Sequence, residues 1–206
     1  LKDLENKKII VFRKFKNAYA LFSGSDIDLD NVTDLNKSKI KDDYDIILSE
    51  LPQLQPIVAK KHFHRTGTQR IFQRFCLVLT SVKKTVEEIV KLDISSSSAG
   101  AFIFLCRTKE DSQKDFDDKL IELSQIKFPK PIVIGTSKNF EEFFGYALEI
   151  AALKRVRSTV TAIEGDSIAK KELKGRLNAY QNLLFNSLYL NFESASWTFN
   201  KEKLKE

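Results

Sequence analysis

The chain has 206 residues, of which 42% are hydrophobic and 30% are charged, and its formal net charge is +6. This balance is typical of a folded globular protein and excludes an intrinsically disordered chain. No apolar run approaches the ~20 residues that a membrane-spanning helix needs, so we expect no membrane partner. The positive charge suits an anionic partner, although a solvated basic face is the commoner explanation.

Two further features of the composition bear on where the chain comes from. It begins at Leu1 and contains no methionine, which indicates a piece of a longer protein. Cys76 and Cys106 lie in apolar runs and have no CxxC neighbour. We therefore predict two buried free thiols and a reducing, cytoplasmic location.

The first half of the chain predicts strands, turns and short helices. Segments 8–15 and 18–22 are rich in β-branched and aromatic residues, which favours two strands joined by a tight turn. Asp42 is placed to cap a short helix that follows it. Segment 55–79 predicts a strand, a turn at 66–68 and a second, longer strand.

A run of serines followed by Ala-Gly predicts a flexible joint over 95–100. We therefore expect a hairpin-rich α+β half at 1–94 and a second half at 101–206. The two halves either form separate domains or contribute strands to one shared sheet.

The second half alternates strands and helices. Segment 101–106 is wholly apolar, as in a strand covered on both faces, and 131–135 is a second run of this kind. A helix capped near Asp111 or Ser112 follows the first, and a helix capped by Asn139 follows the second. The short joints predict a βαβα unit with parallel strands. A long terminal helix over 167–192 completes an α/β (mixed α+β) fold with a mixed sheet.

Three carboxylates, Asp26, Asp28 and Asp30, alternate with apolar residues directly behind a Gly-Ser pair. On a strand they would project from one face, where they could bind Mg²⁺ and serve catalysis. The segment resembles the acidic half of the polymerase-β-like nucleotidyltransferase motif, but no helix separates the Gly-Ser pair from the acids. The alternative is that these acids end a turn or cap a helix that begins near Asn31.

The most chemically dense segment is a basic stretch around one glycine. Its turn could bind a phosphate through backbone N–H groups and guanidinium forks, and its aromatic residues could stack on bases. The alternative is a solvated hairpin tip, and no third ligand accompanies its histidines to form a metal site. The candidate nucleic-acid or phosphate site comprises Lys60, Lys61, His64, Arg65, Thr66, Gly67, Thr68 and Arg70.

Three stretches belong together: residues 12–30 (FRKFKNAYALFSGSDIDLD), 55–72 (QPIVAKKHFHRTGTQRIF) and parts of 149–177 (EIAALKRV…EGDSIAKKELKGRL). In this order they resemble a middle region of very large bacterial P-loop ATPases associated with bacteriophage defence. The resemblance implies an accessory region beside the ATPase core. No Walker A motif is present in this sequence, so ATP and Mg²⁺ would bind elsewhere in the parent protein and no cofactor is expected in this fragment.

Three hypotheses for the function follow. The first is a non-catalytic interaction or coupling domain of such an ATPase, whose partners are neighbouring domains and, in one version, DNA or RNA. The second is a metal-dependent nucleotidyltransferase that uses Asp26 and Asp28. The third is a nucleic-acid-binding module that uses the basic hairpin at 60–74.

Overall fold

A computed structural model describes residues 1–7, 9–13, 18–21, 27–92, 94, 96–136, 140–199 and 202–203. The chain divides into two compact units. The helical unit comprises Leu1–Leu51 and Glu141–Ser187, and the sheet unit comprises Pro52–Phe140 and Leu188–Glu206. Helices and strands combine in a mixed α/β fold, as the sequence predicts.

The helical unit begins with a small hairpin and consists otherwise of helices. Strands β1 and β2 pair antiparallel, with Ile10 opposite Leu21, which confirms the hairpin predicted for this part of the chain. The elements are α1 (Lys2–Asn6), β1 (Ile10–Arg13), β2 (Ala18–Leu21), α2 (Leu29–Ile40), α3 (Tyr44–Ser49), α7 (Phe140–Thr159), α8 (Ala162–Gly165) and α9 (Ser167–Ser194), of which the last residues belong to the sheet unit.

Small side chains form part of the core of the helical unit. Ala151 and Ala152 of α7 are buried against Ile40 of α2, and such small residues let two helices approach closely. Ile47 of α3 is fully buried. The cap of α3 is Asp43, whose side chain accepts a hydrogen bond from the Ile46 N–H at 3.1 Å, rather than the predicted Asp42.

The sheet unit contains a mixed sheet with strand order β3-β4-β5-β6-β7-β8 among the described residues. Its three central strands, β4, β5 and β6, run parallel, and the other neighbours pair antiparallel. The elements are β3 (Ile57–Val58), α4 (Lys60–Thr66), β4 (Ile71–Val78), α5 (Val82–Lys91), β5 (Gly100–Cys106), α6 (Gln113–Leu123), β6 (Ile132–Thr136), β7 (Ser196–Phe199) and β8 (Glu202–Lys203).

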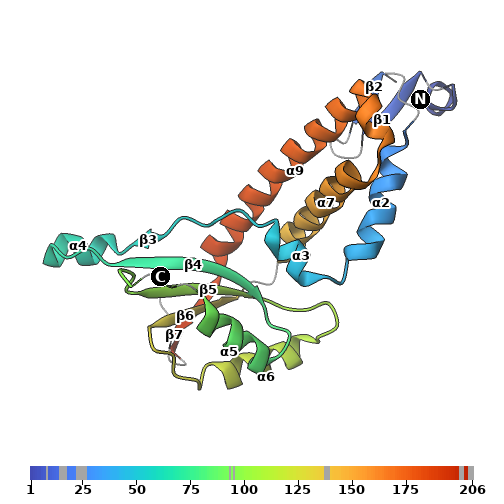
Figure 1. The fold of residues 1–206 in the computed structure, drawn as a ribbon. Helices are drawn as coiled ribbons and strands as arrows, with labels where there is room; N and C mark the ends of the chain where they lie inside the picture. Colours follow the sequence, from blue (N-terminus) through green and yellow to red (C-terminus); the bar gives the residue numbers. More distant parts are fainter. Residues whose placement is uncertain are drawn as a thin grey trace. The chain divides into compact units, whose positions relative to one another are not determined.

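The two faces of this sheet are covered differently. Helices α5 and α6 cover one face (Figure 1), where Ile89, Phe116 and Leu123 pack with the strand residues Ile103 and Leu105. Because alternate residues of a strand point to opposite faces, Phe102 and Phe104 point to the other face. There they contact aromatic rings from the last part of the chain. The ring centroids of Phe102 and Trp197 lie 5.2 Å apart, and those of Phe104 and Phe192 lie 5.4 Å apart.

The structure divides the chain differently from the predicted halves at 1–94 and 101–206. Segment 95–100 lies within the sheet unit, because β4 before it and β5 after it are paired along seven residues from Phe72 to Val78. The alternative of a shared sheet therefore holds for β4 and β5. The predicted strand–helix–strand order of β5, α6 and β6 is also confirmed, with parallel strands.

The helices predicted for the second half differ in how they relate to the sheet. The last helix of the predicted βαβα unit is α7, and its residues from Glu141 onward belong to the helical unit rather than to the sheet unit. Ser112 is confirmed as the cap of α6, with a reciprocal capping box to Asp115, whereas the predicted cap Asn139 lies outside the described residues. Of the described helices, none combines the length and the apolarity needed to cross a membrane.

The close approach of β6 and β7 generates a stability prediction. A β-carbon added at Gly135 would collide with the ring of Trp197 on the neighbouring strand. We expect Gly135→Ala to lower the free energy of unfolding by about 1–3 kcal/mol, the usual cost of overpacking a core. Urea unfolding followed by the fluorescence of Trp197, the only tryptophan in the chain, would measure this change.

Gly145→Ala is the matched control. An added β-carbon at Gly145 meets nothing within 4 Å, and the residue lies in the interior of α7. This substitution should instead stabilise the helix, by about 0.5–1 kcal/mol. Equal midpoints for Gly135→Ala and the unsubstituted protein would show that the glycine is not required at this contact.

Candidate functional site

The acidic segment is the beginning of a helix and not a strand. Helix α2 starts at Leu29, and the Asp28 carboxylate caps it by accepting a hydrogen bond from the Asn31 N–H at 3.1 Å. The predicted alternation of Asp28 and Asp30 on one strand face is therefore wrong. Asp26 lies outside the described residues. The alternative interpretation, that these acids cap a helix near Asn31, is correct for Asp28.

Asp30 binds a buried arginine of α9. Its Oδ1 lies 2.7 Å from Nη1 of Arg176, whose side chain is only 7% exposed. Glu172, one helical turn earlier on α9, accepts from Nη2 and Nε of the same guanidinium at 2.7 and 3.1 Å. The arginine thus holds a carboxylate from α2 and a carboxylate from its own helix together.

The charge of Arg176 is secured by these partners. Burial lowers the pKa of its guanidinium, but the hydrogen bonds and charges of Asp30 and Glu172 outweigh burial, so the net shift is upward. A buried arginine that kept only one of these carboxylates would be poorly compensated. The most direct role of Asp30 in the described structure is therefore to neutralise Arg176.

A second ion pair joins α2 to α7. The Lys37 ammonium binds Glu149, and Asp34 lies 2.9 Å from the same nitrogen. Burial lowers the pKa of Lys37, whereas hydrogen bonds and charges from both acids raise it, and the net direction is upward. Two charged contacts thus hold α2 against its neighbours. Within the described ranges, no three His, Cys, Asp or Glu side chains are grouped so that they could bind a metal ion.

The predicted basic hairpin contains a helix at its tip. Strands β3 and β4 do pair antiparallel, with Ile57 opposite Phe72, but residues Lys60–Thr66 between them form α4. Gly67 ends this helix in the left-handed conformation, with φ of +68°. The predicted positive φ is confirmed, but the predicted hairpin turn is wrong, because the glycine ends a helix.

The candidate residues on α4 point in different directions around the helix axis. Helical residues turn by 100° per position, so the charged side chains do not converge on one backbone turn. The Thr66 hydroxyl donates to the His62 carbonyl oxygen and accepts from the Thr68 N–H, so it serves the helix end. The candidate residues on this segment that the structure leaves exposed are Lys60, Lys61, His64, Arg65, Thr66, Gly67, Thr68 and Arg70.

The two cysteines meet across neighbouring strands. The sulfur atoms of Cys76 on β4 and Cys106 on β5 lie 3.6 Å apart, and both thiols are free. Cys106 is fully buried, and burial together with the neighbouring Cys76 raises the pKa of its thiol well above the ordinary value. A protonated buried thiol is a poor nucleophile, so Cys106 fits the predicted role of a buried structural thiol, whereas Cys76 is only partly buried.

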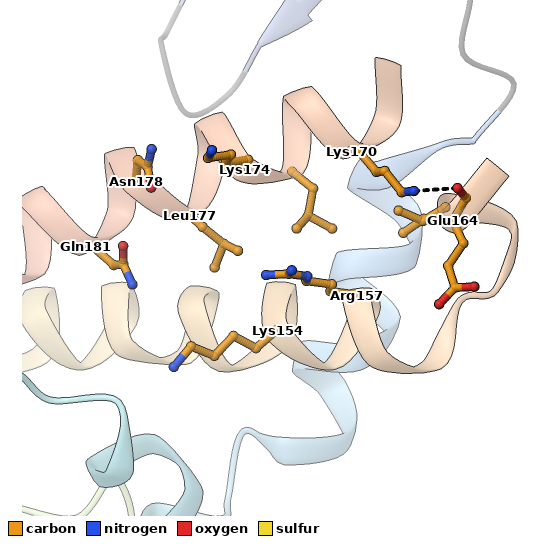
Figure 2. Close-up of a pocket in the computed structure, with 10 residues that line it drawn as sticks. Lys154, Arg157, Glu164, Lys170, Lys174, Leu177, Asn178 and Gln181 are labelled. Carbon is orange, nitrogen blue, oxygen red and sulfur yellow. Dashed lines mark hydrogen bonds between the residues drawn. The ribbon is translucent and has the colours of Figure 1, made fainter. Parts of the chain in front are cut away.

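A groove that the sequence does not reveal opens between α7 and α9 in the helical unit. Its volume is about 760 Å³. Figure 2 shows Lys154 and Arg157 on α7 and Lys170 and Lys174 on α9, with the Arg157 side chain reaching into the space between the helices. The floor is apolar and is formed in part by Leu173 and Leu177, which are buried.

The side chains of this cationic groove differ in how far they are neutralised. Lys154 binds Glu50 of α3, and Lys170 donates to the backbone oxygen of Glu164. Arg157 and Lys174 have no hydrogen bond or ion pair within the part of the chain that the structure describes. Two cations are therefore available to a ligand, whereas the charge of Lys154 is offset by Glu50.

Comparison with known proteins adds no assignment to this geometry. No family model, no curated protein and no solved structure matches the chain.

The buried arginine generates the next prediction. Arg176→Met keeps the length of the side chain but leaves Asp30 and Glu172 without their cation. We expect the helical unit to lose about 2–4 kcal/mol of stability, somewhat less than for a fully buried pair because Asp30 is 30% exposed. Thermal unfolding followed by far-ultraviolet circular dichroism would measure the loss.

Lys7→Met provides the control in the same unit. Lys7 pairs with Asp3 at 3.0 Å, but both side chains are more than half exposed, at 62% and 77%. Exposed pairs of this kind contribute about 0–1 kcal/mol. If both variants unfold at the same temperature, Arg176 does not hold the helices in the way described.

Proposed function

We propose that this chain is a non-catalytic interaction and coupling module of a larger bacterial ATPase, with neighbouring domains as its partners. The observation that carries the proposal is the division of α9 between two cores. Leu184 is buried in the helical unit, whereas Leu188 and Phe192, further along the same helix, are buried in the sheet unit. A continuous helix with residues in two cores is suited to link events in one unit to the other.

Segments 12–30, 55–72 and 149–177 resemble parts of large defence-type ATPases, and this resemblance supports the proposal that the parent protein is such an ATPase. Nucleotide and Mg²⁺ would then be bound by Walker motifs outside these residues. A cytoplasmic location agrees with the free thiols of Cys76 and Cys106, because such a close pair would be exposed to oxidation in a secretory compartment.

The nucleotidyltransferase hypothesis has little support from the described contacts. Asp28 accepts from the α2 backbone, and Asp30 is bound to Arg176. Each carboxylate makes its contact through one oxygen, and Mg²⁺ would compete with the helix backbone and with Arg176 for these two acids. A nucleic-acid-binding module based on the 60–74 segment remains the second candidate, favoured by the exposed charges of α4 and the exposed ring of Phe63.

Asp28→Asn separates capping from catalysis. Asparagine caps a helix about as well as aspartate, so stability should be preserved, whereas Asp28→Ala should cost about 1 kcal/mol. Asparagine cannot replace aspartate as an anionic Mg²⁺ ligand. We expect no Mg²⁺-dependent incorporation of labelled ATP or CTP by the unsubstituted chain or by the asparagine variant. Incorporation that disappears in Asp28→Asn would defeat the non-catalytic proposal.

Breaking α9 tests the coupling role in the full-length parent ATPase. Asn186 is an exposed helical residue next to the boundary between the units, and proline there should cost about 3 kcal/mol of local helix stability. We expect Asn186→Pro to leave ATP hydrolysis intact but to abolish protection against phage infection. Asn186→Ala, which keeps the helix, should retain both.

Circular dichroism on the purified chain shows whether the proline variant still folds. If it does not, insertion of two glycines after Asn186 gives a milder interruption. Full protection by a folded, helix-broken variant would mean that the continuity of α9 is not used.

A further inference from the structure

The cationic groove has the chemical make-up of an anion site. Between positions 154 and 176, basic residues outnumber acidic ones, and two of the acids are already engaged. Asp166 caps α9 by accepting from the backbone N–H groups of Ile168 and Ala169, and Glu172 binds Arg176. The remaining acid, Glu164, lies at the groove with its carbonyl bound to Lys170. The groove lining contains four cations and one acid, Glu164, and Glu50 offsets the charge of Lys154, so the lining keeps a net positive charge.

The positions of the cations suit a chain of phosphates better than a single anion. Lys170 and Lys174 are one helical turn apart, which separates their α-carbons by about 6 Å along α9. That spacing is close to the distance between adjacent phosphates on an extended single strand. Arg157 provides a further cation on the opposite wall, on α7, where Lys154 lies about one turn earlier but binds Glu50.

The rest of the lining fits the nucleoside part of such a chain. Buried Ile163, Leu173 and Leu177 provide an apolar floor for sugars and base faces. Asn178 and Gln181 line the same groove, and each amide can both donate and accept hydrogen bonds at a base edge. No aromatic ring is among the residues recorded along the groove, so base identity would contribute little and the phosphates would provide most of the affinity.

We propose that the groove between α7 and α9 binds the backbone of single-stranded nucleic acid. Cations on two facing helices surround a recessed apolar floor that a single strand can enter. A duplex keeps its bases stacked inside and presents phosphates on a convex surface, so it cannot reach that floor. Binding here is independent of the coupling role, because it requires only the helical unit and would persist if α9 transmitted nothing.

The experiment measures binding of the purified chain to a fluorescein-labelled single-stranded oligonucleotide of mixed sequence, by fluorescence anisotropy over a series of salt concentrations. Arg157→Gln combined with Lys174→Gln removes the two available cations. We expect the affinity at low salt to fall about tenfold or more and the slope of log K against log salt to become shallower by about 1.4, at about 0.7 per lost contact on a single strand.

Two matched double variants remove the same charge elsewhere. Lys39→Gln with Lys41→Gln changes exposed residues of the helical unit at the end of α2. Lys61→Gln with Arg65→Gln changes exposed residues of α4 in the sheet unit. We expect the Lys39→Gln and Lys41→Gln control to retain the affinity and slope of the unsubstituted chain within the small effect of net charge. The α4 pair tests the second candidate site, and we expect it to lose less affinity than the groove variant. Circular dichroism confirms that all variants are folded.

Several outcomes would overturn the assignment. Equal losses in the groove and control variants would show that net charge alone attracts the oligonucleotide. A loss confined to Lys61→Gln with Arg65→Gln would move the site to α4. Preference for a duplex of the same sequence, or equal displacement by polyglutamate, would reject single-stranded nucleic acid as the occupant. The absence of measurable binding at low salt would reject the site itself.

Discussion

The helix α9 has to bury one apolar stripe in two separate cores, and much of the structure follows from that constraint. Ala169, Leu173, Leu177 and Leu184 recur at helical spacing and are buried with the helical unit. The same stripe continues into the sheet unit, where Phe192 stacks on Phe104 of β5. The buried apolar positions recur every four to seven residues from Ala169 to Phe192, which leaves other positions of the helix available for charged contacts.

The charged residues of α9 are of two kinds, buried and exposed. Arg176 is withdrawn from water and therefore needs both Asp30 and Glu172, since an uncompensated buried charge is strongly destabilising. Lys170 and Lys174 stay exposed and line the groove, where Glu164 is the only acidic side chain among the described lining residues. The acidic segment that first suggests catalysis and the basic groove that suggests binding are thus complementary parts of one arrangement around α9.

Local patterns in the sequence were sufficient for many elements and insufficient for others. The apolar runs at β5 and β6 and the stripe of α9 predict these elements correctly, because burial on both faces or on one helical face leaves a periodic trace. The buried stripe of α2 is not apparent in the sequence, because two of its members, Thr33 and Asn36, are polar. Each donates a hydrogen bond to the carbonyl oxygen four residues earlier. The α4 helix was missed although Gly67 is a typical helix-ending residue.

The groove and the division into units could not be predicted in this way, because both depend on segments that are distant in the chain. Lys37 and Glu149 are separated by 112 positions, and no local period links them. Once α7 and α9 are packed, however, Arg157 and Lys174 face a common space, and a ligand that binds both walls would stabilise the packing of these two helices by linkage. Because α9 also supplies Leu188 and Phe192 to the sheet unit, such a ligand would act on a helix that contributes to both cores.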